Sequence, residues 1–216
     1  MVNRTEAINF ARNLFEELVD YGMDRTNPAG SIGHLDLPND ITWACGASRI
    51  AIWRNDSDYV IKMPINADCL KYCEREVEIY HEAVEEGIEE YFAWCDCAIA
   101  PADNDGFGVY VMEFLNCDED SIDDDSMEYS FKEYCRSNDL DSEDENVRDD
   151  FLDWYWDSDD CGDAVIDYLV EQIPETSVQR KVYRFINNED ISDIHSGNVG
   201  YRNNTLVFCD YASYGW

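Results

Sequence analysis

The sequence has few basic residues and no long apolar run. Of 216 residues, 15 are lysine or arginine and 49 are aspartate or glutamate, which gives a formal net charge of −34. Such a chain repels the phosphate backbone, so direct nucleic-acid binding over a broad surface is excluded. No stretch approaches the roughly 18 apolar residues that are typical of a membrane span, so we expect no membrane association.

The N-terminus lacks the apolar core of a secretory signal peptide, because residues 1–6 lead into an amphipathic helical pattern. We therefore predict a cytoplasmic protein whose nine cysteines are reduced thiols, most of them packed as small apolar side chains. Cys69, Cys73, Cys95 and Cys97 offer a competing zinc site. Neither pair has the two-residue gap that is common in structural zinc sites, which favours buried thiols.

Histidine is also scarce, and three histidines are too few for a histidine-rich metal centre. No arrangement resembles a Ser-His-Asp nucleophile. In contrast, 45% of the residues are hydrophobic and 13% are aromatic, which is far more apolar than a disordered chain of this charge. The chain is therefore expected to fold around a real core.

The hydrophobic periodicity and the turn residues predict an α+β chain in two lobes, residues 1–115 and 116–216. Asn3 with Glu6 predicts a capped first helix. The further expected elements are strands over 41–53 (containing Gly46) and 58–63, a helix over 67–86, a hairpin of 98–101 and 107–112, helices over 164–173 and 177–185, and a hairpin of 198–201 and 205–208.

Half of the net charge lies in one segment. Between positions 117 and 163 there are 20 acidic and 3 basic residues, a net of −17. Apolar residues at helical spacing predict two short acidic helices around a mobile stretch at 137–146, with Tyr129, Phe131, Trp154 and Trp156 beneath outward carboxylates. The segment is either a solvated face or a surface that imitates DNA and attracts a cationic partner.

Five polar residues have the chemistry to hold a metal-bound triphosphate. Lys62 ends a predicted strand, and Glu76 in the next helix could pair with it. Asn198 and Asp210 are hard oxygen ligands of the kind that suit Mg²⁺. Asp193 is a third carboxylate, which could orient an attacking hydroxyl and accept its proton.

On these residues the sequence resembles the protein-kinase superfamily, in the branch with aminoglycoside-phosphotransferase-like catalytic loops, and is most similar to small kinase-like proteins of phages and bacteria. The resemblance runs from about position 45 to the C-terminus. Its most specific part is Asp-x-His-x-Gly-Asn at 193–198, followed by a hairpin into Asp-Tyr-Ala at 210–212. It implies a catalytic Asp193, an Asn198 and an Asp210 that bind Mg²⁺, and a phosphate-anchoring Lys62 paired with Glu76.

The resemblance also implies an ATP site. Residues 45–49 would cover the phosphates through Gly46 and Ser48, although this loop has one glycine where kinases have three. Residues 109–115 would form the last strand of the small lobe and the hinge that contacts adenine, with Glu113 and Leu115 beside the nucleotide.

The resemblance predicts a minimal kinase-like fold: an antiparallel sheet and a helix in the N-lobe, and an acidic helical C-lobe truncated soon after Asp210. His195 is expected to bond the backbone of its loop. The expected activity is ATP- and Mg²⁺-dependent transfer to a hydroxyl, and the charge favours a basic protein or a cationic small molecule as acceptor. The alternatives are a pseudokinase, or an acidic DNA-mimic-like protein that blocks a basic host protein, acting in the host cytoplasm if the chain is phage-encoded.

Overall fold

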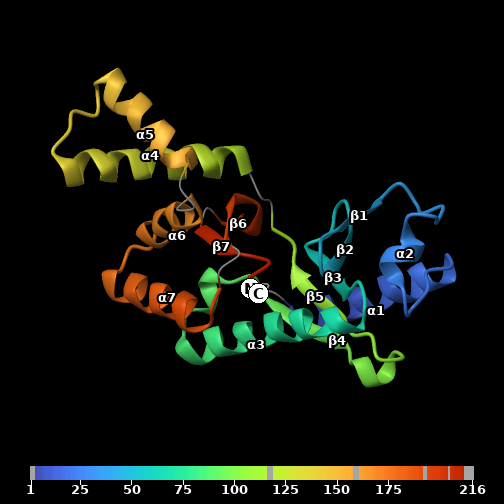
Figure 1. Cartoon of the computed structure of the whole chain (residues 1–216). Coiled ribbons are helices and arrows are strands. Elements are labelled where there is room, and N and C mark those ends of the chain that lie inside the picture. Colours follow the sequence, from blue (N-terminus) through green and yellow to red (C-terminus); the bar gives the residue numbers. More distant parts are fainter. Residues whose placement is uncertain (1–2, 116–118, 158–160, 192–193, 204, 212–216) are drawn as a thin grey trace. The chain divides into compact units, whose positions relative to one another are not determined.

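A computed structural model describes residues 3–115, 119–157, 161–191, 194–203 and 205–211 (Figure 1). The chain divides into two compact units, Met1–Leu115 and Asn116–Trp216. Among the described residues, no helix combines the length and the apolar composition needed to cross a bilayer.

The first unit is built on a five-stranded antiparallel sheet with the order β1-β2-β3-β5-β4. Its strands are β1 (Ile41–Cys45), β2 (Arg49–Arg54), β3 (Tyr59–Pro64), β4 (Cys95–Ile99) and β5 (Val109–Glu113). With the helices described below, this sheet confirms the predicted α+β class.

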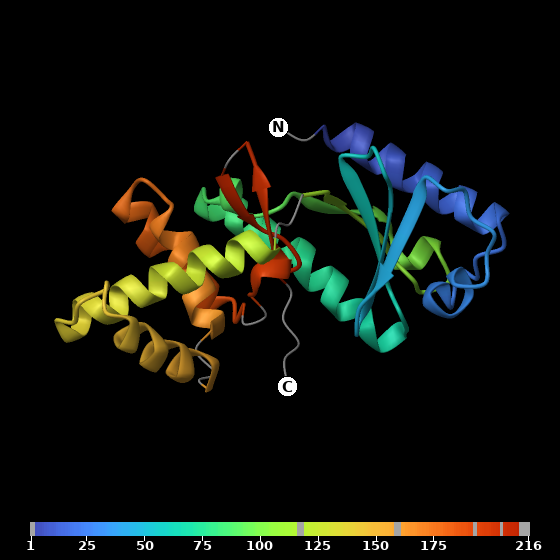
Figure 2. The same ribbon diagram turned by 90° about the horizontal axis from the view of Figure 1, so that it is seen from above.

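Two long helices cover opposite faces of this sheet, as Figure 2 shows. Helix α1 (Arg4–Asp20) buries its apolar stripe in a core that it shares with alternate residues of the strands. That core includes Phe15 of α1, Ile52 of β2 and Ile61 of β3. On the other face lies α3 (Leu70–Glu86), which is preceded by the short 3-10 helix η1 (Ala67–Cys69).

Local signals set the ends of these helices. The side chain of Asn3 accepts a hydrogen bond from the backbone of Glu6 at 3.4 Å, which confirms the predicted cap of α1. Helix α3 is capped at its C-terminal end by Gly87, whose φ of +65° is a left-handed conformation that costs glycine little. A short helix, α2 (Pro28–Ile32), is capped by Asn27 and also packs near the first core.

The single strand predicted over 41–53 is wrong. The structure has two strands there, because the chain reverses at Gly46 and pairs Cys45 with Ile50. The backbone N–H of Gly46 donates to the carbonyl of Arg49 at 2.9 Å and closes this turn. Apolar alternation continues through both strands, so periodicity alone does not reveal the reversal.

The second unit contains four α-helices, the short 3-10 helix η4 (Ser196–Asn198) and a hairpin within its described residues. The α-helices and strands are α4 (Glu119–Asn138), α5 (Glu145–Asp157), α6 (Cys161–Glu171), α7 (Thr176–Asn188), β6 (Val199–Arg202) and β7 (Thr205–Phe208). The last two strands pair in antiparallel fashion around Asn203, as the sequence predicts.

Helices α4 and α5 pack against each other over an aromatic core of their own. This core comprises Phe131, Cys135, Phe151 and Tyr155. The prediction that Trp154 packs inward is wrong, because Trp154 is 48% exposed and stacks on Tyr134 at 5.9 Å between ring centroids. Phe151 already fills the space between the helices. The Trp156 side chain lies outside the described part.

Candidate functional site

Lys62 is a charged residue in a strand whose six residues are all buried. It lies opposite Tyr110 of β5 in the sheet register, and only 6% of it is exposed. Burying an ammonium group is costly unless a partner of opposite charge compensates it. The strand therefore requires a carboxylate on the face that α3 covers.

Glu76 supplies that carboxylate. Its Oε1 accepts a hydrogen bond from Lys62 Nζ at 2.9 Å, and 2% of Glu76 is exposed. The residue lies on the buried face of α3 with Cys73 and Ile79, one helical turn from each. The structure thus brings together the two residues for which the sequence suggested an ion pair.

A second cation, which the sequence analysis missed, shares this carboxylate. Arg49 Nη1 lies 3.3 Å from the same Oε1 of Glu76, and Arg49 is 6% exposed. Strand alternation carries a signal for it, because Ile50 and Ile52 face the α1 core and so direct Arg49 to the opposite face. One buried carboxylate therefore ties β2 and β3 to α3.

The four cysteines that the sequence offers as a zinc site form no disulfide in the described structure. Cys69, Cys73 and Cys95 are buried, and the Cys95 thiol donates to the carbonyl of Glu76 at 3.3 Å. Burial, reinforced by the Asp96 carboxylate, raises the pKa of Cys97. A raised pKa keeps the thiol protonated, and a protonated thiol is a poor metal ligand.

The predicted nucleotide-binding residues of this unit lie in two places. Gly46 is exposed at the β1–β2 turn, whereas Ser48 is 1% exposed and its carbonyl accepts from Ile65 N–H at 3.0 Å. Glu113 and Leu115 lie at and just after the end of β5. The N–H of Glu113 already donates to Trp94 at 2.8 Å, so an adenine contact at the hinge would need other groups.

In the second unit, Asn198 lies at the start of the β6–β7 hairpin. It ends the short 3-10 helix η4 (Ser196–Asn198), in which its N–H donates to the carbonyl of His195 at 2.9 Å. His195 Nδ1 accepts from the Gly197 N–H at 3.1 Å, which confirms that this histidine bonds loop backbone. The predicted catalytic residue Asp193 lies outside the described residues.

Asp210 lies at the same end of the hairpin as Asn198. The Cys209 N–H donates to the Asn198 carbonyl at 2.8 Å, which extends the β6–β7 ladder by one bond. Asp210 follows with a φ of +56°, in a left-handed region that few residues other than glycine adopt. Such conformations are held by their surroundings and often occur at functional sites.

The pair of Asn198 and Asp210 fits a hard divalent cation in its chemistry. Both offer oxygen ligands, and Mg²⁺ binds through one or two protein carboxylates plus water and phosphate oxygens. No cluster of three histidine, cysteine, aspartate or glutamate side chains suited to a metal occurs in the part of the chain that the structure describes. A Mg²⁺ ion held partly by a nucleotide does not need such a cluster.

Comparison with known proteins finds no family model, no curated protein and no solved structure that matches this chain. The resemblance to kinases consequently stays a prediction that depends on individual residues.

The ion pair predicts a large cost for removing the carboxylate. Glu76→Gln leaves two cations buried around a neutral amide, and we expect the free energy of unfolding to fall by about 3 kcal/mol. The matched control is Glu78→Gln, which removes a 65% exposed carboxylate from the same helix. That change should alter stability by less than about 0.5 kcal/mol. Urea denaturation of the full chain measures both, and equal effects would contradict the structural importance of this pair.

Proposed function

We propose that this protein is a kinase-like phosphotransferase that uses ATP and Mg²⁺ to phosphorylate a hydroxyl group. The observation that carries the proposal is the buried ion pair of Lys62 in β3 with Glu76 in the following helix. In protein kinases, a lysine on the third strand pairs with a glutamate of the next helix and contacts the nucleotide phosphates.

Each candidate residue has a role in this reaction. Lys62 would place a positive charge on the phosphate oxygens, and Glu76 would hold the ammonium group in position. Asn198 and Asp210 would hold Mg²⁺, which when bound neutralises negative charge on the transferring phosphate. Asp193 would orient the acceptor hydroxyl and accept its proton. Gly46, Ser48, Glu113 and Leu115 would line the nucleotide.

The acceptor is proposed to be cationic. At a net charge of −34, the protein attracts basic proteins and amine-bearing small molecules and repels polyanions. The field of the whole chain thus favours an acceptor with a positive charge near its hydroxyl group.

The proposal predicts that Mg·ATP stabilises the protein. A ligand present at about 100 times its Kd should raise the free energy of unfolding by about 2.7 kcal/mol. Lys62→Met should lose most of the resulting increase in Tm, because the charge on the phosphates is gone. Lys71→Met, at an exposed lysine of α3, is the control and should retain it. A Tm of the unmutated protein that does not respond to millimolar Mg·ATP would sink the proposal.

Two carboxylate variants should fail at different steps. Asp210→Asn should abolish Mg²⁺-dependent ATP binding, because it removes a metal ligand. Asp193→Asn should leave ATP binding intact and slow transfer by about 100-fold or more, which is typical of losing a general base. ATP turnover and nucleotide affinity measure the two steps. Turnover by Asp193→Asn at the rate of the unmutated protein would show that this role is misassigned.

A second candidate function is supported by the acidic surface of α4, α5 and the loop that joins them. Among the side chains that the structure describes there, ten carboxylates are exposed: Asp123, Asp124, Asp125, Asp139, Asp141, Glu143, Asp144, Glu145, Asp149 and Asp150. The basic residues Lys132, Arg136 and Arg148 pair with Glu128 or Glu133 of α4. We infer that this surface could bind a basic host protein by imitating DNA, on a pseudokinase scaffold or an active one.

Neutralising the acidic surface tests this alternative. The variant Asp123→Asn, Asp124→Asn, Asp149→Asn, Asp150→Asn spares the aromatic core and the turn-forming Asp141 and Asp144. If the surface recognises a basic protein, pull-downs from the host should lose that protein, and high salt should weaken capture by the unmutated protein.

The control for this variant replaces exposed glutamates 85, 86, 89 and 90 of the first unit with glutamine, which changes the charge equally. Recovery of the same proteins with both variants would exclude the α4–α5 surface as the recognition site.

A further inference from the structure

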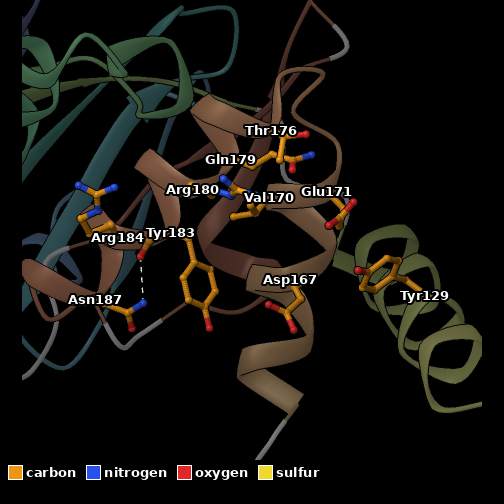
Figure 3. Close-up of a pocket in the computed structure, with 10 residues that line it drawn as sticks. All are labelled: Tyr129, Asp167, Val170, Glu171, Thr176, Gln179, Arg180, Tyr183, Arg184 and Asn187. Atoms are coloured by element: carbon orange, nitrogen blue, oxygen red, sulfur yellow. Dashed lines mark hydrogen bonds between the residues drawn. The ribbon is translucent and has the colours of Figure 1, made fainter. Parts of the chain in front are cut away.

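A pocket of about 640 Å³ lies within the second unit, between α6 and α7 (Figure 3). Tyr129 of α4 lines one side of it, and the other lining residues come from α6 and α7. The volume is in the range of about 300–1,000 Å³ that is usual for small-ligand sites. None of its lining residues belongs to the nucleotide site proposed above.

Helix α7 forms a positively charged wall of this pocket. Its residues Thr176–Asn188 include Arg180, Lys181 and Arg184 and no acidic residue, in a chain that has 15 basic residues in total. The apolar side of the helix is buried, whereas Arg180, Tyr183 and Arg184 are exposed. The two arginines are one helical turn apart, and like charges at this spacing repel each other.

These two arginines have no partner among the described residues. Eight other arginines form a hydrogen bond or an ion pair with a described residue, for example Arg148 with Glu128. Arg180 and Arg184 form neither within the described ranges, although the chain has 49 acidic residues. A guanidinium group at the lining of a pocket is suited to bind a carboxylate from a ligand.

Helix α6 forms a negatively charged wall. Asp167 and Glu171 are also one helical turn apart, and both line the pocket (Figure 3). The Tyr129 hydroxyl lies in the field of these carboxylates. Burial raises the pKa of Tyr129, and the negative charges of Glu171, Glu133 and Asp167 raise it further. The pocket therefore has cations on one helix and anions on its neighbour.

This separation of charge selects the class of ligand. A polyanion would be repelled by Asp167 and Glu171, and a polycation by Arg180 and Arg184. A ligand with one group of each sign satisfies both walls. Helix α7 also places the side-chain amides of Gln179 and Asn187 at this pocket. Their nitrogens donate to the carbonyls of Ile173 at 2.8 Å and Tyr183 at 3.0 Å, and their oxygens can accept hydrogen bonds from the N–H groups of a peptide.

We propose that the α6–α7 pocket binds a short peptide segment that carries one acidic and one basic side chain. The guanidinium groups of Arg180 and Arg184 receive the acidic side chain, and the carboxylates of Asp167 and Glu171 receive the basic one. Tyr129 and Tyr183 contact the residues between them. The site is independent of phosphoryl transfer, and no nucleotide takes part in its test.

The probe is a blocked tetrapeptide in which a lysine and a glutamate are separated by tyrosine and glycine. Three matched peptides replace the lysine, the glutamate or both by glutamine. NMR titration of the full chain should shift the α6 and α7 amide signals. The peptide with both charges should bind about two- to five-fold more tightly than either singly charged peptide, as expected for exposed ion pairs.

Two double variants test which helix receives each charged side chain of the peptide. Arg180→Gln with Arg184→Gln should abolish the preference for glutamate in the peptide and keep the preference for lysine. Asp167→Asn with Glu171→Gln should do the reverse. All four side chains are exposed, so both proteins should fold. Arg136→Gln, at a 77% exposed arginine of α4, is the control and should change neither preference.

Equal binding of all four peptides to the unmutated protein would overturn the proposal. So would the absence of any shift in the α6 and α7 signals in the millimolar range, or preferences that both double variants leave unchanged.

Discussion

The buried contact of Lys62 with Glu76 is the interaction on which the first unit depends most. A lysine in the middle of a fully buried strand is tolerable only if a carboxylate meets it at hydrogen-bond distance. At 2.9 Å, Glu76 meets this requirement, and Arg49 at 3.3 Å adds β2 to the same contact. Apolar contacts alone would permit α3 to rotate or slide on the sheet. The carboxylate removes that freedom, because Glu76 reaches Lys62 and Arg49 only when α3 has one rotation about its axis and one position along the sheet.

In the second unit, the small number of basic residues relative to acidic ones is the main feature of the charge distribution. Most cations of this chain serve as partners for carboxylates, as Lys132 and Arg148 do beside Glu128 of α4. In helix α7, Arg180 and Arg184 have no such partner within the described ranges, and they line a pocket together with two carboxylates of α6. The protein thus combines a strongly acidic helical pair with a small dipolar pocket, and these two surfaces would attract different kinds of ligand.

Much of the secondary structure is predictable from local sequence. The Asn3 cap, the helix that carries Glu76 and the hairpin around Asn203 each have signals within a few residues, and the structure contains all three. The two wrong predictions, the single strand over 41–53 and the inward Trp154, concern features that tertiary packing determines. The reversal at Gly46 is hidden by apolar alternation on both sides of it, and Trp154 is displaced from the core because Phe151 occupies that position.

The sequence by itself determined the acidic character, the α+β class and the residue types of the candidate site, because these follow from composition and short-range periodicity. Only the tertiary structure decided that Arg49 joins Lys62 at one carboxylate, and that Arg180 lines a pocket with Glu171. Both arrangements depend on strand register or on the packing of separate helices. Many distant side chains determine these together, so no local pattern in the sequence specifies them.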